Sequence, residues 1–475
     1  MTEPDAIVIG GGIAGLACAL ALGDAGLRVT LLEQSDSLGG RARSCTAAET
    51  GDRIDLGPHI MLTEYRNMLR LLGQLGTRDR VVWQQQQLLT LVGRPHPVTV
   101  RVHRLPAPLH LLPSLLGVPQ VSLRDLASNA RLFWRVARLG RADALRLDDT
   151  SAEDCLRAMG VSERFIEWFW RSAAMTVMNV PLERCSAGAL LGFFRYLIGT
   201  SGFQVGFAGE GLGDLFAPPA LRRIETVGGS VRLHTRVVRL TGTDRAACGV
   251  RLADGSELRA RWCVAAVPPS CLAPLLPESW AARHAMIGDL ASFAPSPYIS
   301  SYLWFDRKLT RERFWSKVWS PDTLNYDFYD LSNIRPGWSE RGSVIASNII
   351  HSQRAEHLSD EQIVAATVRE LAEFVPEAEQ ARVVHARVHR IPMAIPAPYP
   401  GSEQRRPATT TPIEGLLLAG DWVRTGLPAS MESAVRAGWL AAEQVLAAAN
   451  RPRQLVCPLP PMQGLVRLVG GRAAR

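Results

Sequence analysis

The sequence predicts an α/β fold in which a domain built on a parallel sheet is interrupted by an inserted α+β domain. Three observations support this prediction. Apolar runs at 5–9 and 416–419 end in glycine, as buried parallel strands do. A helical pattern follows the glycines in both places. Between them lie long stretches rich in aromatic side chains and proline, and 475 residues suffice for two or three domains.

The first thirty-odd residues have the order strand, glycine turn, helix, strand. Gly10, Gly12 and Gly15 follow the first run and precede a predicted helix over 16–25. Gly10 permits a tight turn, Gly12 lets backbone N–H groups approach a pyrophosphate, and Gly15 allows the helix to pack closely on the strand. The positive end of the helix faces the phosphate charge.

An acidic residue stands where such a site needs one. Glu33 follows a second predicted strand over 28–32, eighteen residues beyond Gly15, where a carboxylate can accept from a ribose hydroxyl. A glycine-rich turn without a ligand is the alternative interpretation. The strand, helix and acid around the turn favour a dinucleotide site of the Rossmann type.

The early apolar run resembles neither a membrane span nor a signal peptide. The stretch 6–22 is short, carries four glycines and has no basic segment before it. With no export signal, we expect a cytoplasmic protein with reduced thiols. The eight cysteines form no C-x-x-C pair, so no metal site is predicted.

The residues after Glu33 indicate which dinucleotide is bound. Gln34 to Ser44 reads QSDSLGGRARS, with a second glycine turn that ends at Gly40 and with Arg41 after it. This segment resembles the L-G-G-R motif of the flavin-containing amine oxidase and carotenoid desaturase superfamily. The resemblance implies FAD in a Rossmann-like domain of the GR2 type, with Glu33 on the adenosine ribose and Arg41 beside the pyrophosphate. Taken alone, Arg41 could equally be an ordinary surface arginine.

Three further segments match this superfamily. Gly57, Pro58 and His59 belong to an Asp-x-Gly-x-His segment of the kind that lies near the flavin ring, although His59 could also be a core histidine. The stretch from 209 resembles a desaturase signature, which implies a backbone contact from Val237 to the adenine end. The block at 416–439 places Asp421 after a buried strand and Met431 at the start of a helix.

No cysteine stands where covalently flavinylated relatives carry one, so we expect non-covalent FAD. The residues expected to bind it are Gly10, Gly12, Ile13, Ala14, Gly15, Glu33, Gln34, Gly40, Arg41, Gly57, Pro58, His59, Val237, Gly420, Asp421, Ser430 and Met431.

The resemblance divides the chain into alternating segments. The expected parts are a first FAD-binding segment (1–100), a helical substrate or membrane-facing lobe (101–208), a second FAD-binding segment (209–275), a substrate-binding lobe (276–409), a C-terminal FAD-binding segment (410–450) and a tail (451–475). Within the substrate-binding lobe we predict a strand over 298–305 and a helix over 360–374, capped by Ser359.

The helical lobe carries two suggestive patterns. A proline-broken apolar segment, 105–116, precedes a predicted arginine-bearing amphipathic helix over 123–139, which could lie in a membrane interface or simply cover its own domain. The aromatic-rich stretch 165–202 could form a helical core or line an apolar channel. No basic patch with interleaved aromatic residues is present, so no nucleic-acid partner is predicted.

Within the superfamily the sequence is most similar to plant-type carotenoid desaturases and to the squalene-associated hydroxysqualene dehydroxylases. Pro58 departs from the latter, which usually carry glutamine there. The resemblance implies an FAD-dependent oxidoreductase acting on a long apolar isoprenoid, first as a dehydroxylase that yields squalene for hopanoid or sterol synthesis. The alternatives are a phytoene-type carotenoid desaturase, a flavin amine oxidase and a non-catalytic flavin-binding escort.

Either isoprenoid reaction needs a proton carrier and an electron partner. The candidate proton carriers are His59, Glu210 and Glu432. Since the chain has one dinucleotide motif, we expect an external partner: a quinone, a reductase or a nicotinamide cofactor. An insoluble substrate also predicts peripheral attachment to the inner face of the membrane.

Overall fold

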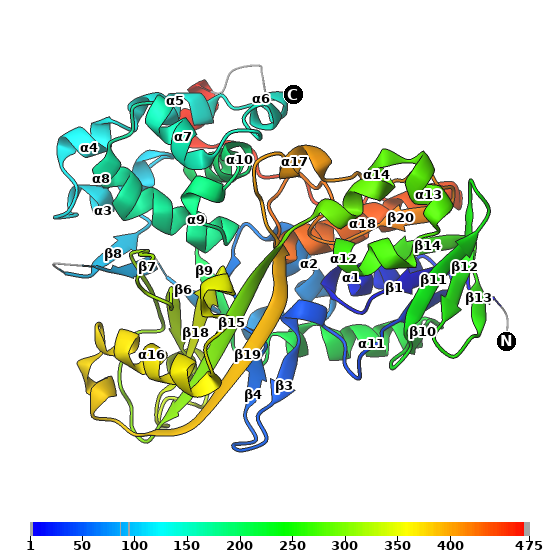
Figure 1. The fold of residues 1–475 in the computed structure, drawn as a ribbon, viewed down its shortest axis with the longest axis horizontal. Coiled ribbons are helices and arrows are strands. Elements are labelled where there is room, and N and C mark those ends of the chain that lie inside the picture. The colour runs from blue at the N-terminus through cyan, green and yellow to red at the C-terminus, as the bar shows by residue number, and fades with distance from the viewer. Residues whose placement is uncertain (1–2, 86, 94–95, 470–475) are drawn as a thin grey trace.

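The computed structural model describes residues 3–85, 87–93 and 96–469. Figure 1 shows three parts: a parallel-sheet domain on the right, a helical lobe at the upper left and a sheet lobe at the lower left. The parallel-sheet domain contains both ends of the predicted pattern, and in it residues 13–23 lie beside residues 431–448, more than 400 positions further along the chain.

The parallel sheet has the strand order β10-β2-β1-β14-β20, with every pairing parallel. Its strands are β1 (Ala6–Ile9), β2 (Val29–Leu32), β10 (Ser230–Arg232), β14 (Trp262–Ala265) and β20 (Leu416–Leu418). Both faces of the sheet are covered, which explains the continuous apolar runs in the sequence. Ala6 and Val8 face the helices, whereas Ile7 and Ile9 face a separate antiparallel sheet.

Four helices pack on the first face and three strands on the second. The helices are α1 (Ile13–Gly23), α2 (Arg66–Gln74), α11 (Ala217–Thr226) and α18 (Met431–Ala448). The strands are β11 (Val237–Gly242), β12 (Ala247–Leu252) and β13 (Glu257–Arg259). Helix α1 begins at Ile13 rather than at the predicted residue 16, so Gly15 belongs to its first turn.

The sheet lobe is built on seven strands in the order β19-β15-β18-β17-β16-β7-β8. Their bounds are β7 (Gln87–Val92), β8 (Val98–Arg101), β15 (Pro295–Phe305), β16 (Phe314–Lys317), β17 (Asp327–Asp330), β18 (Val344–Ile350) and β19 (Val383–Pro396). The predicted strand 298–305 forms most of β15. Residues 87–92 and 98–100, which the sequence analysis assigned to the first FAD-binding segment, pair in this second sheet.

Helix α16 (Asp360–Ala372) covers one face of the seven-stranded sheet. Ser359 caps it as predicted: its hydroxyl accepts from Gln362 N, and the Gln362 side chain accepts from Ser359 N in return. The opposite face packs against β4 (Arg53–Asp55) and β9 (Val205–Ala208). Strand β4 pairs with β3 (Ser44–Thr46), and β9 pairs with β5 (Met61–Leu62) and β6 (Val81–Gln84).

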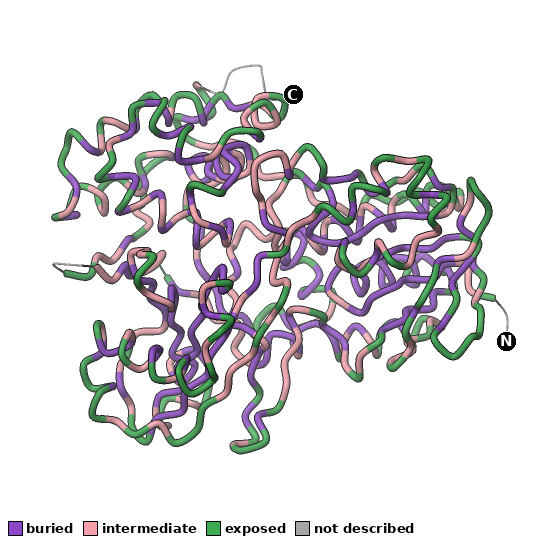
Figure 2. Tube along the Cα trace, viewed as in Figure 1, coloured by how far each residue is buried: buried purple, intermediate pink, exposed green. Residues whose placement is uncertain are grey.

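The helical lobe has its own apolar core, drawn as buried chain within the lobe in Figure 2. Its helices are α3 (Leu112–Leu116), α4 (Leu123–Ala127), α5 (Ala130–Ala137), α6 (Arg141–Arg146), α7 (Ala152–Ala158), α8 (Glu163–Phe165), α9 (Arg171–Met178) and α10 (Ala187–Gly199). The predicted helix over 123–139 is two helices. They part at Asn129, whose amide accepts from Trp170 Nε1 at 3.1 Å.

The aromatic stretch 165–202 forms much of that core. Phe165, Trp168, Trp170 and Phe194 are each at most 6% exposed. Phe169 and Phe193 are half-buried and also contact other aromatic rings. Most of these side chains therefore stabilise the lobe itself. No helix among the described residues is both long and apolar enough to cross a bilayer.

The last described residues return to the helical lobe. Gln463 N donates to Gly199 O at 2.7 Å and Leu465 N donates to Ala107 O at 2.8 Å. Helix α19 (Gly464–Val469) therefore lies beside the proline-broken segment 105–116. Short helices complete the chain: α12 (Pro269–Leu272), α13 (Glu278–Arg283), α14 (Ala285–Gly288), α15 (Leu331–Ile334) and α17 (Ser402–Arg405).

Candidate dinucleotide and substrate site

Two glycine turns meet at the carboxyl end of β1. Gly39 N donates to Gly11 O at 2.8 Å, which holds the second turn against the first. A side chain on Gly15 would place its Cβ 2.0 Å from Gly10 O, so only glycine lets α1 start this close to the strand. A Cβ on Gly12, by contrast, would have no neighbour nearer than Gly40 Cα at 4.0 Å.

The space beside Gly12 lies at the N-terminus of α1. Gly12 is the N-cap residue, and no side chain of a described residue accepts from the N–H groups of the first turn, which contains Ile13, Ala14 and Gly15. The first turn contains no acidic residue either. Unpaired N–H groups and the partial positive charge of a helix N-terminus favour an anion such as a pyrophosphate.

Glu33 lies at the end of β2 and is buried. Its Oε2 accepts from Gly11 N at 2.8 Å, and its Oε1 accepts from Ser35 N at 2.8 Å and from the Ser35 hydroxyl at 2.7 Å. A carboxylate offers about four acceptor positions, so one more remains for a hydroxyl group. Gln34, next in the chain, is exposed.

The strand that carries Val237 starts from the same place. Thr235 N donates to Glu33 O at 2.8 Å and His234 N donates to Ser35 O at 3.0 Å. Strand β11, which begins at Val237, therefore starts next to Glu33, the residue expected to bind the adenosine ribose. The structure brings these two segments together although about 200 residues separate them in the sequence.

Arg41 joins the second glycine turn to two distant segments. Its Nη2 lies 2.6 Å from Asp421 Oδ1, and its Nη1 donates to Ala394 O on β19 at 2.8 Å. The Asp421 side chain is 6% exposed and that of Arg41 is 32% exposed. Gly420, just before the acid, has φ +134°, a conformation that L side chains rarely adopt.

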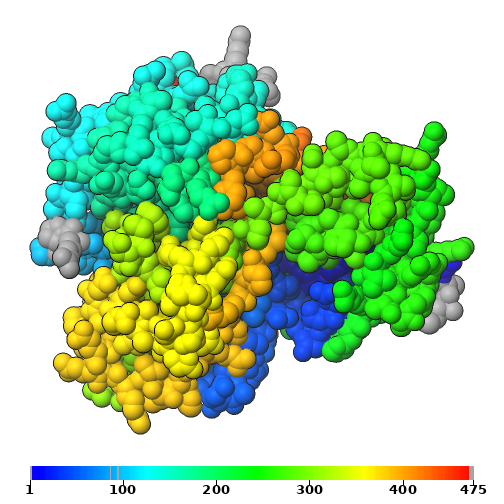
Figure 3. All heavy atoms as spheres, in the orientation of Figure 1, coloured from blue at the N-terminus to red at the C-terminus, as the bar shows by residue number. Residues whose placement is uncertain are grey.

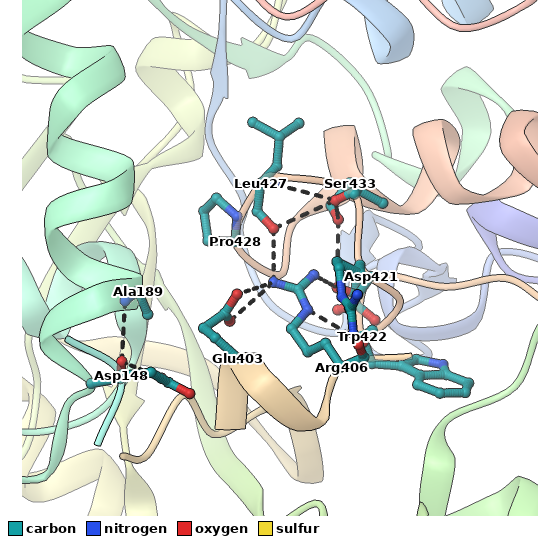
Figure 4. Close-up of polar contacts among 12 residues, drawn as sticks. Asp148, Ala189, Glu403, Arg406, Asp421, Trp422, Leu427, Pro428 and Ser433 are labelled. Atoms are coloured by element: carbon teal, nitrogen blue, oxygen red, sulfur yellow. Dashed lines mark hydrogen bonds and ion pairs between the residues drawn. The ribbon is translucent and has the colours of Figure 1, made fainter. Parts of the chain in front are cut away.

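Arg406 holds the loop that follows Asp421, and the sequence analysis missed it. Figure 4 shows its guanidinium at the centre of this loop. It donates to the carbonyl oxygens of Asp421, Trp422, Val423 and Leu427 at 2.7–3.3 Å, and it pairs with Glu403. The side chain is buried, so one arginine satisfies four carbonyl groups of the loop.

The segment before Arg406 is tied to the helical lobe. Gln404 N donates to Asp148 Oδ2 at 3.0 Å, and Ser186 Oγ donates to Asp148 Oδ1 at 2.6 Å. Figure 3 shows this segment, in orange, at the junction of the helical lobe and the parallel-sheet domain. The loop after β20 is therefore positioned from both parts of the molecule.

Helix α18 starts at this loop. Ser430 is its N-cap, and its hydroxyl accepts from Ser433 N at 3.2 Å. Met431 is 8% exposed. The Ser430 side chain thus satisfies one of the N–H groups in the first turn of α18.

The segment Gly57–His59 lies against the seven-stranded sheet. A Cβ on Gly57 would lie 2.7 Å from Ser300 Oγ on β15, so any other residue here would displace the Ser300 side chain. His59 is half-buried, and its Nδ1 lies 2.8 Å from Gly57 O. Burial lowers the pKa of His59, although the Gly57 carbonyl and Asp55 favour its charged form.

The other two proton-carrier candidates have partners of their own. Glu210 pairs with Arg80 at 2.9 Å, with side chains 37% and 50% exposed. Glu432 is buried and accepts from Asn67 N, Asn67 Nδ2 and Met68 N at 2.6–3.1 Å, which caps α2. Burial raises the pKa of Glu432. His59 is therefore the one of the three that the structure places beside Gly57 and the substrate-lobe sheet.

The residues at this site fit a dinucleotide. An uncapped helix end faces open space beside Gly12, and Glu33 stands at the end of the adjacent strand. Arg41, Asp421 and the start of α18 lie at the same edge of the sheet. Such an edge, at the carboxyl ends of parallel strands, is where α/β domains bind nucleotides.

Comparison with known proteins agrees with this arrangement. A model of the family described as flavin-containing amine oxidoreductases matches residues 13–446. The 15-cis-phytoene desaturase of Solanum lycopersicum is 29% identical over 459 residues, which cover 94% of this chain and 78% of that protein. A 15-cis-phytoene desaturase of Synechococcus elongatus is 26% identical over 466 residues, covering 93% and 95%.

Solved structures show the same fold at lower identity. Putrescine oxidase bound to putrescine has a TM-score of 0.71 at 17% identity and covers 94% of this chain and 99% of its own. Cyclohexylamine oxidase from Brevibacterium oxydans has a TM-score of 0.70 at 18% identity, covering 95% and 100%. At this identity the likeness concerns the fold alone.

Proposed function

The chain belongs to the flavin-containing amine oxidoreductase family, and we propose that it desaturates a long linear isoprenoid. It is an FAD-dependent oxidoreductase. The observation that carries the proposal is the match to phytoene desaturases over 93–94% of the chain, which includes both substrate lobes. A third relative, a probable zeta-carotene desaturase of Synechococcus elongatus, is 24% identical over 475 residues.

FAD, when bound, supplies the two-electron acceptor for such a reaction. The protein's part is to hold the cofactor and exclude water from the reacting carbons. The N-terminus of α1, Glu33 and Arg41 would hold the dinucleotide. Gly57 and His59 would lie at the boundary between the cofactor and the seven-stranded sheet, where Gly57 approaches Ser300 and Asn348.

The proposal is tested with the FAD-loaded protein and phytoene in lipid vesicles under anaerobic conditions. Loss of the oxidised-flavin absorbance, together with products lighter by two hydrogens per new double bond, is the expected result. Reduction of the flavin by amines with hydrogen peroxide formation in air, and none by phytoene, would overturn it in favour of an amine oxidase.

A reductive reaction is the second candidate. In it, a hydroxylated C30 isoprenoid would take up a hydride from the reduced cofactor at the carbon that carries the hydroxyl group, and the hydroxyl group would leave as water with one added proton, which gives squalene. The observation that favours it is a buried carboxyl group, Asp327, on the substrate-lobe face that meets Gly57. Conversion of hydroxysqualene to squalene by chemically reduced enzyme, without action on phytoene, would select this candidate.

The electrons must reach a partner outside the chain, and the substrate must come from a membrane. We therefore also propose that the protein attaches to the bilayer surface on the cytoplasmic side and passes electrons to a quinone, a reductase or a nicotinamide cofactor. Exposed large apolar side chains gather on the helical lobe and on α19. They are Leu105, Leu109, Leu112, Leu116, Leu123, Trp134, Leu465 and Leu468, the leucine patch.

Charge around the leucine patch suits an anionic surface. Five arginine side chains near the patch are exposed. They are Arg124 on α4, Arg131 and Arg135 on α5, Arg138 just after α5, and Arg467 on α19. The leucine side chains would enter the acyl boundary, and the arginine side chains would contact the head groups. Apolar burial and electrostatic attraction would then both contribute to the binding free energy. The sequence analysis placed this surface on 105–116 and 123–139, and the proposal adds α19 to it.

A further inference from the structure

A row of polar side chains crosses five strands of the substrate-lobe sheet. The row contains one residue from each strand, and each residue is directly paired with the next. In order across the sheet they are His389 (β19), Ser300 (β15), Asn348 (β18), Asp327 (β17) and Ser316 (β16). Directly paired residues point to the same face of a sheet. These five, the polar row, therefore form one continuous band.

The polar row lies on the face that meets the cofactor domain. In the neighbouring row, Tyr302, Tyr329 and Phe314 pack with Ile54 and Phe207 on that face, whereas α16 covers the other one. Gly57 approaches the middle of the row, since a Cβ on it would lie 2.7 Å from Ser300 Oγ and 3.6 Å from Asn348 Oδ1. A polar band thus adjoins the segment expected beside the flavin ring.

Only the middle of the polar row is satisfied internally. Ser300 Oγ donates to Asn348 Oδ1 at 2.6 Å. At the far end, Asp327 Oδ2 accepts from Tyr329 Oη at 2.9 Å, but its Oδ1 and the neighbouring Ser316 Oγ make no hydrogen bond with any described residue. Asp327 is 7% exposed and Ser316 is 0% exposed. A buried polar group without a hydrogen-bond partner destabilises the folded state, so a partner for these two atoms is expected.

We propose that Asp327 and Ser316 bind an oxygen atom, hydroxyl or carbonyl, carried by the long apolar ligand of this site. The proposal rests on the proposed function, because that function supplies the apolar ligand. A serine hydroxyl can donate and a carboxyl group can accept or donate, so the pair suits either kind of oxygen. The rings of Tyr329 and Phe314 beside it suit an apolar body.

The protonation of Asp327 fits this role. Burial raises the pKa of Asp327 to about 7, against the lowering effect of the Tyr329 hydroxyl and the Asn348 amide beside it. Near neutral pH the group therefore exists in both forms. An oxygen ligand that either donates or accepts would find its complement there.

Two ligands of this reaction class carry such an oxygen on an isoprenoid chain. One is an isoprenoid alcohol, which would be the substrate of the reductive reaction. The other is an isoprenoid quinone, which would receive the electrons from desaturation. Their common chemistry is recognised by the same pair of side chains, and the experiment separates them.

The experiment measures binding rather than turnover. Three probes are titrated into the oxidised, FAD-loaded protein in detergent micelles: squalene, hydroxysqualene and a prenylated benzoquinone. The change in flavin absorbance gives each dissociation constant. The variants are Asp327→Asn and Ser316→Ala, and the control is Ser301→Ala, whose hydroxyl lies near Thr367 on the opposite face. Thermal unfolding and flavin content establish that each variant is folded.

We expect at least one oxygen-bearing probe to bind the wild-type protein about 10-fold more tightly than squalene. Ser316→Ala and Asp327→Asn should each remove most of that preference while leaving squalene binding and the control unchanged. Loss of the preference for hydroxysqualene identifies a substrate subsite, and loss for the quinone identifies an acceptor subsite.

Equal affinities for all three probes, or a preference that both variants retain, would overturn the inference, because buried water would then account for the unpaired atoms. If Asp327→Asn does not fold, Ser316→Ala decides alone. Failure of both oxygen-bearing probes to bind the wild-type protein would also overturn the inference, whereas the proposed function is decided separately by the phytoene assay.

Discussion

Arg41 Nη2 lies 2.6 Å from Asp421 Oδ1, and this contact joins the second glycine turn to the loop after β20, 380 residues further along the chain. Because the Asp421 side chain is almost fully buried, loss of Arg41 leaves a buried carboxylate without its main partner. The pair therefore couples the two halves of the expected cofactor site.

We predict that Arg41→Gln weakens FAD binding about 10-fold or more, and more than Asp421→Asn does. The loss of binding free energy in the double variant should be smaller than the sum of the losses in the two single variants, by a coupling energy of about 0.5–3 kcal/mol. Fluorescence of released flavin measures the affinities. Arg251→Gln, which breaks an exposed pair with Glu257 at 2.8 Å, is the control and should change nothing. Additive effects of the two substitutions would show that the pair does not act as a unit.

Glu33→Gln should weaken FAD binding by about 1.5–3 kcal/mol, the range for hydrogen bonds to a charged group. The amide keeps one acceptor but loses the charge, and its NH2 group would face the Gly11 or Ser35 N–H donors. Equilibrium dialysis measures the affinity. Asp36→Asn, an exposed acid three residues further on, is the matched control. An unchanged affinity in Glu33→Gln would mean that the nucleotide lies elsewhere.

Gly438→Ala should destabilise the protein by about 1–3 kcal/mol through overpacking. Its Cβ would lie 2.2 Å from Ala14 O, in the first turn of α1, so α18 and α1 would have to separate at the phosphate-binding end. Thermal unfolding and flavin retention measure the effect. Gly192→Ala in α10 meets no atom within 4 Å and should be neutral or slightly stabilising. Equal behaviour of the two variants would contradict the close packing.

Much of the parallel-sheet domain could be predicted from sequence because its signals are local. The turn at Gly10, the acid at Glu33 and the strand before Asp421 each stand next to the element that gives them meaning. Arg406 could not be found this way, since the chain has 53 lysine and arginine residues and nothing near it indicates a buried role. Only the folded loop shows the carbonyl groups that it satisfies.

The polar row could not be predicted from the sequence for a similar reason. Its members come from five strands spread over residues 300–389, and they align only once the register of every pairing is known. The sequence analysis also did not predict that β7 and β8, which lie before residue 102, belong to the seven-stranded sheet. Pairing between distant strands depends on tertiary packing, which a single sequence does not display.

Asp327 should make stability depend on pH. Its folded-state pKa is raised from 3.8 to about 7, so the native state holds a proton that the unfolded state releases. This contribution is fully present below pH 4 and is lost as pH rises through 7, with a slope of at most about 1.4 kcal/mol per pH unit. Thermal unfolding from pH 5 to 8 should show Asp327→Asn gaining on the wild type as pH rises. Parallel curves, as expected for the exposed control Asp322→Asn, would contradict this.

Membrane attachment through the leucine patch predicts two separable contributions to binding. Co-sedimentation with liposomes should be stronger for anionic than for neutral lipid, and salt should weaken only the anionic excess, because exposed charges are screened. Leu112→Asp, Leu116→Asp and Leu468→Asp should each reduce binding to both lipids about 10-fold, since each places a charge where an apolar side chain would be buried.

Leu468 is the decisive position in this set, because it comes from α19 and is 79% exposed. The control is Val238→Asp, at a 37% exposed apolar residue on β11 in the parallel-sheet domain, which should bind as the wild type does. Binding that survives Leu112→Asp and Leu116→Asp would refute the location. Binding lost in those two but kept in Leu468→Asp would confine the surface to 105–116 and exclude α19. No binding to either lipid would refute attachment itself.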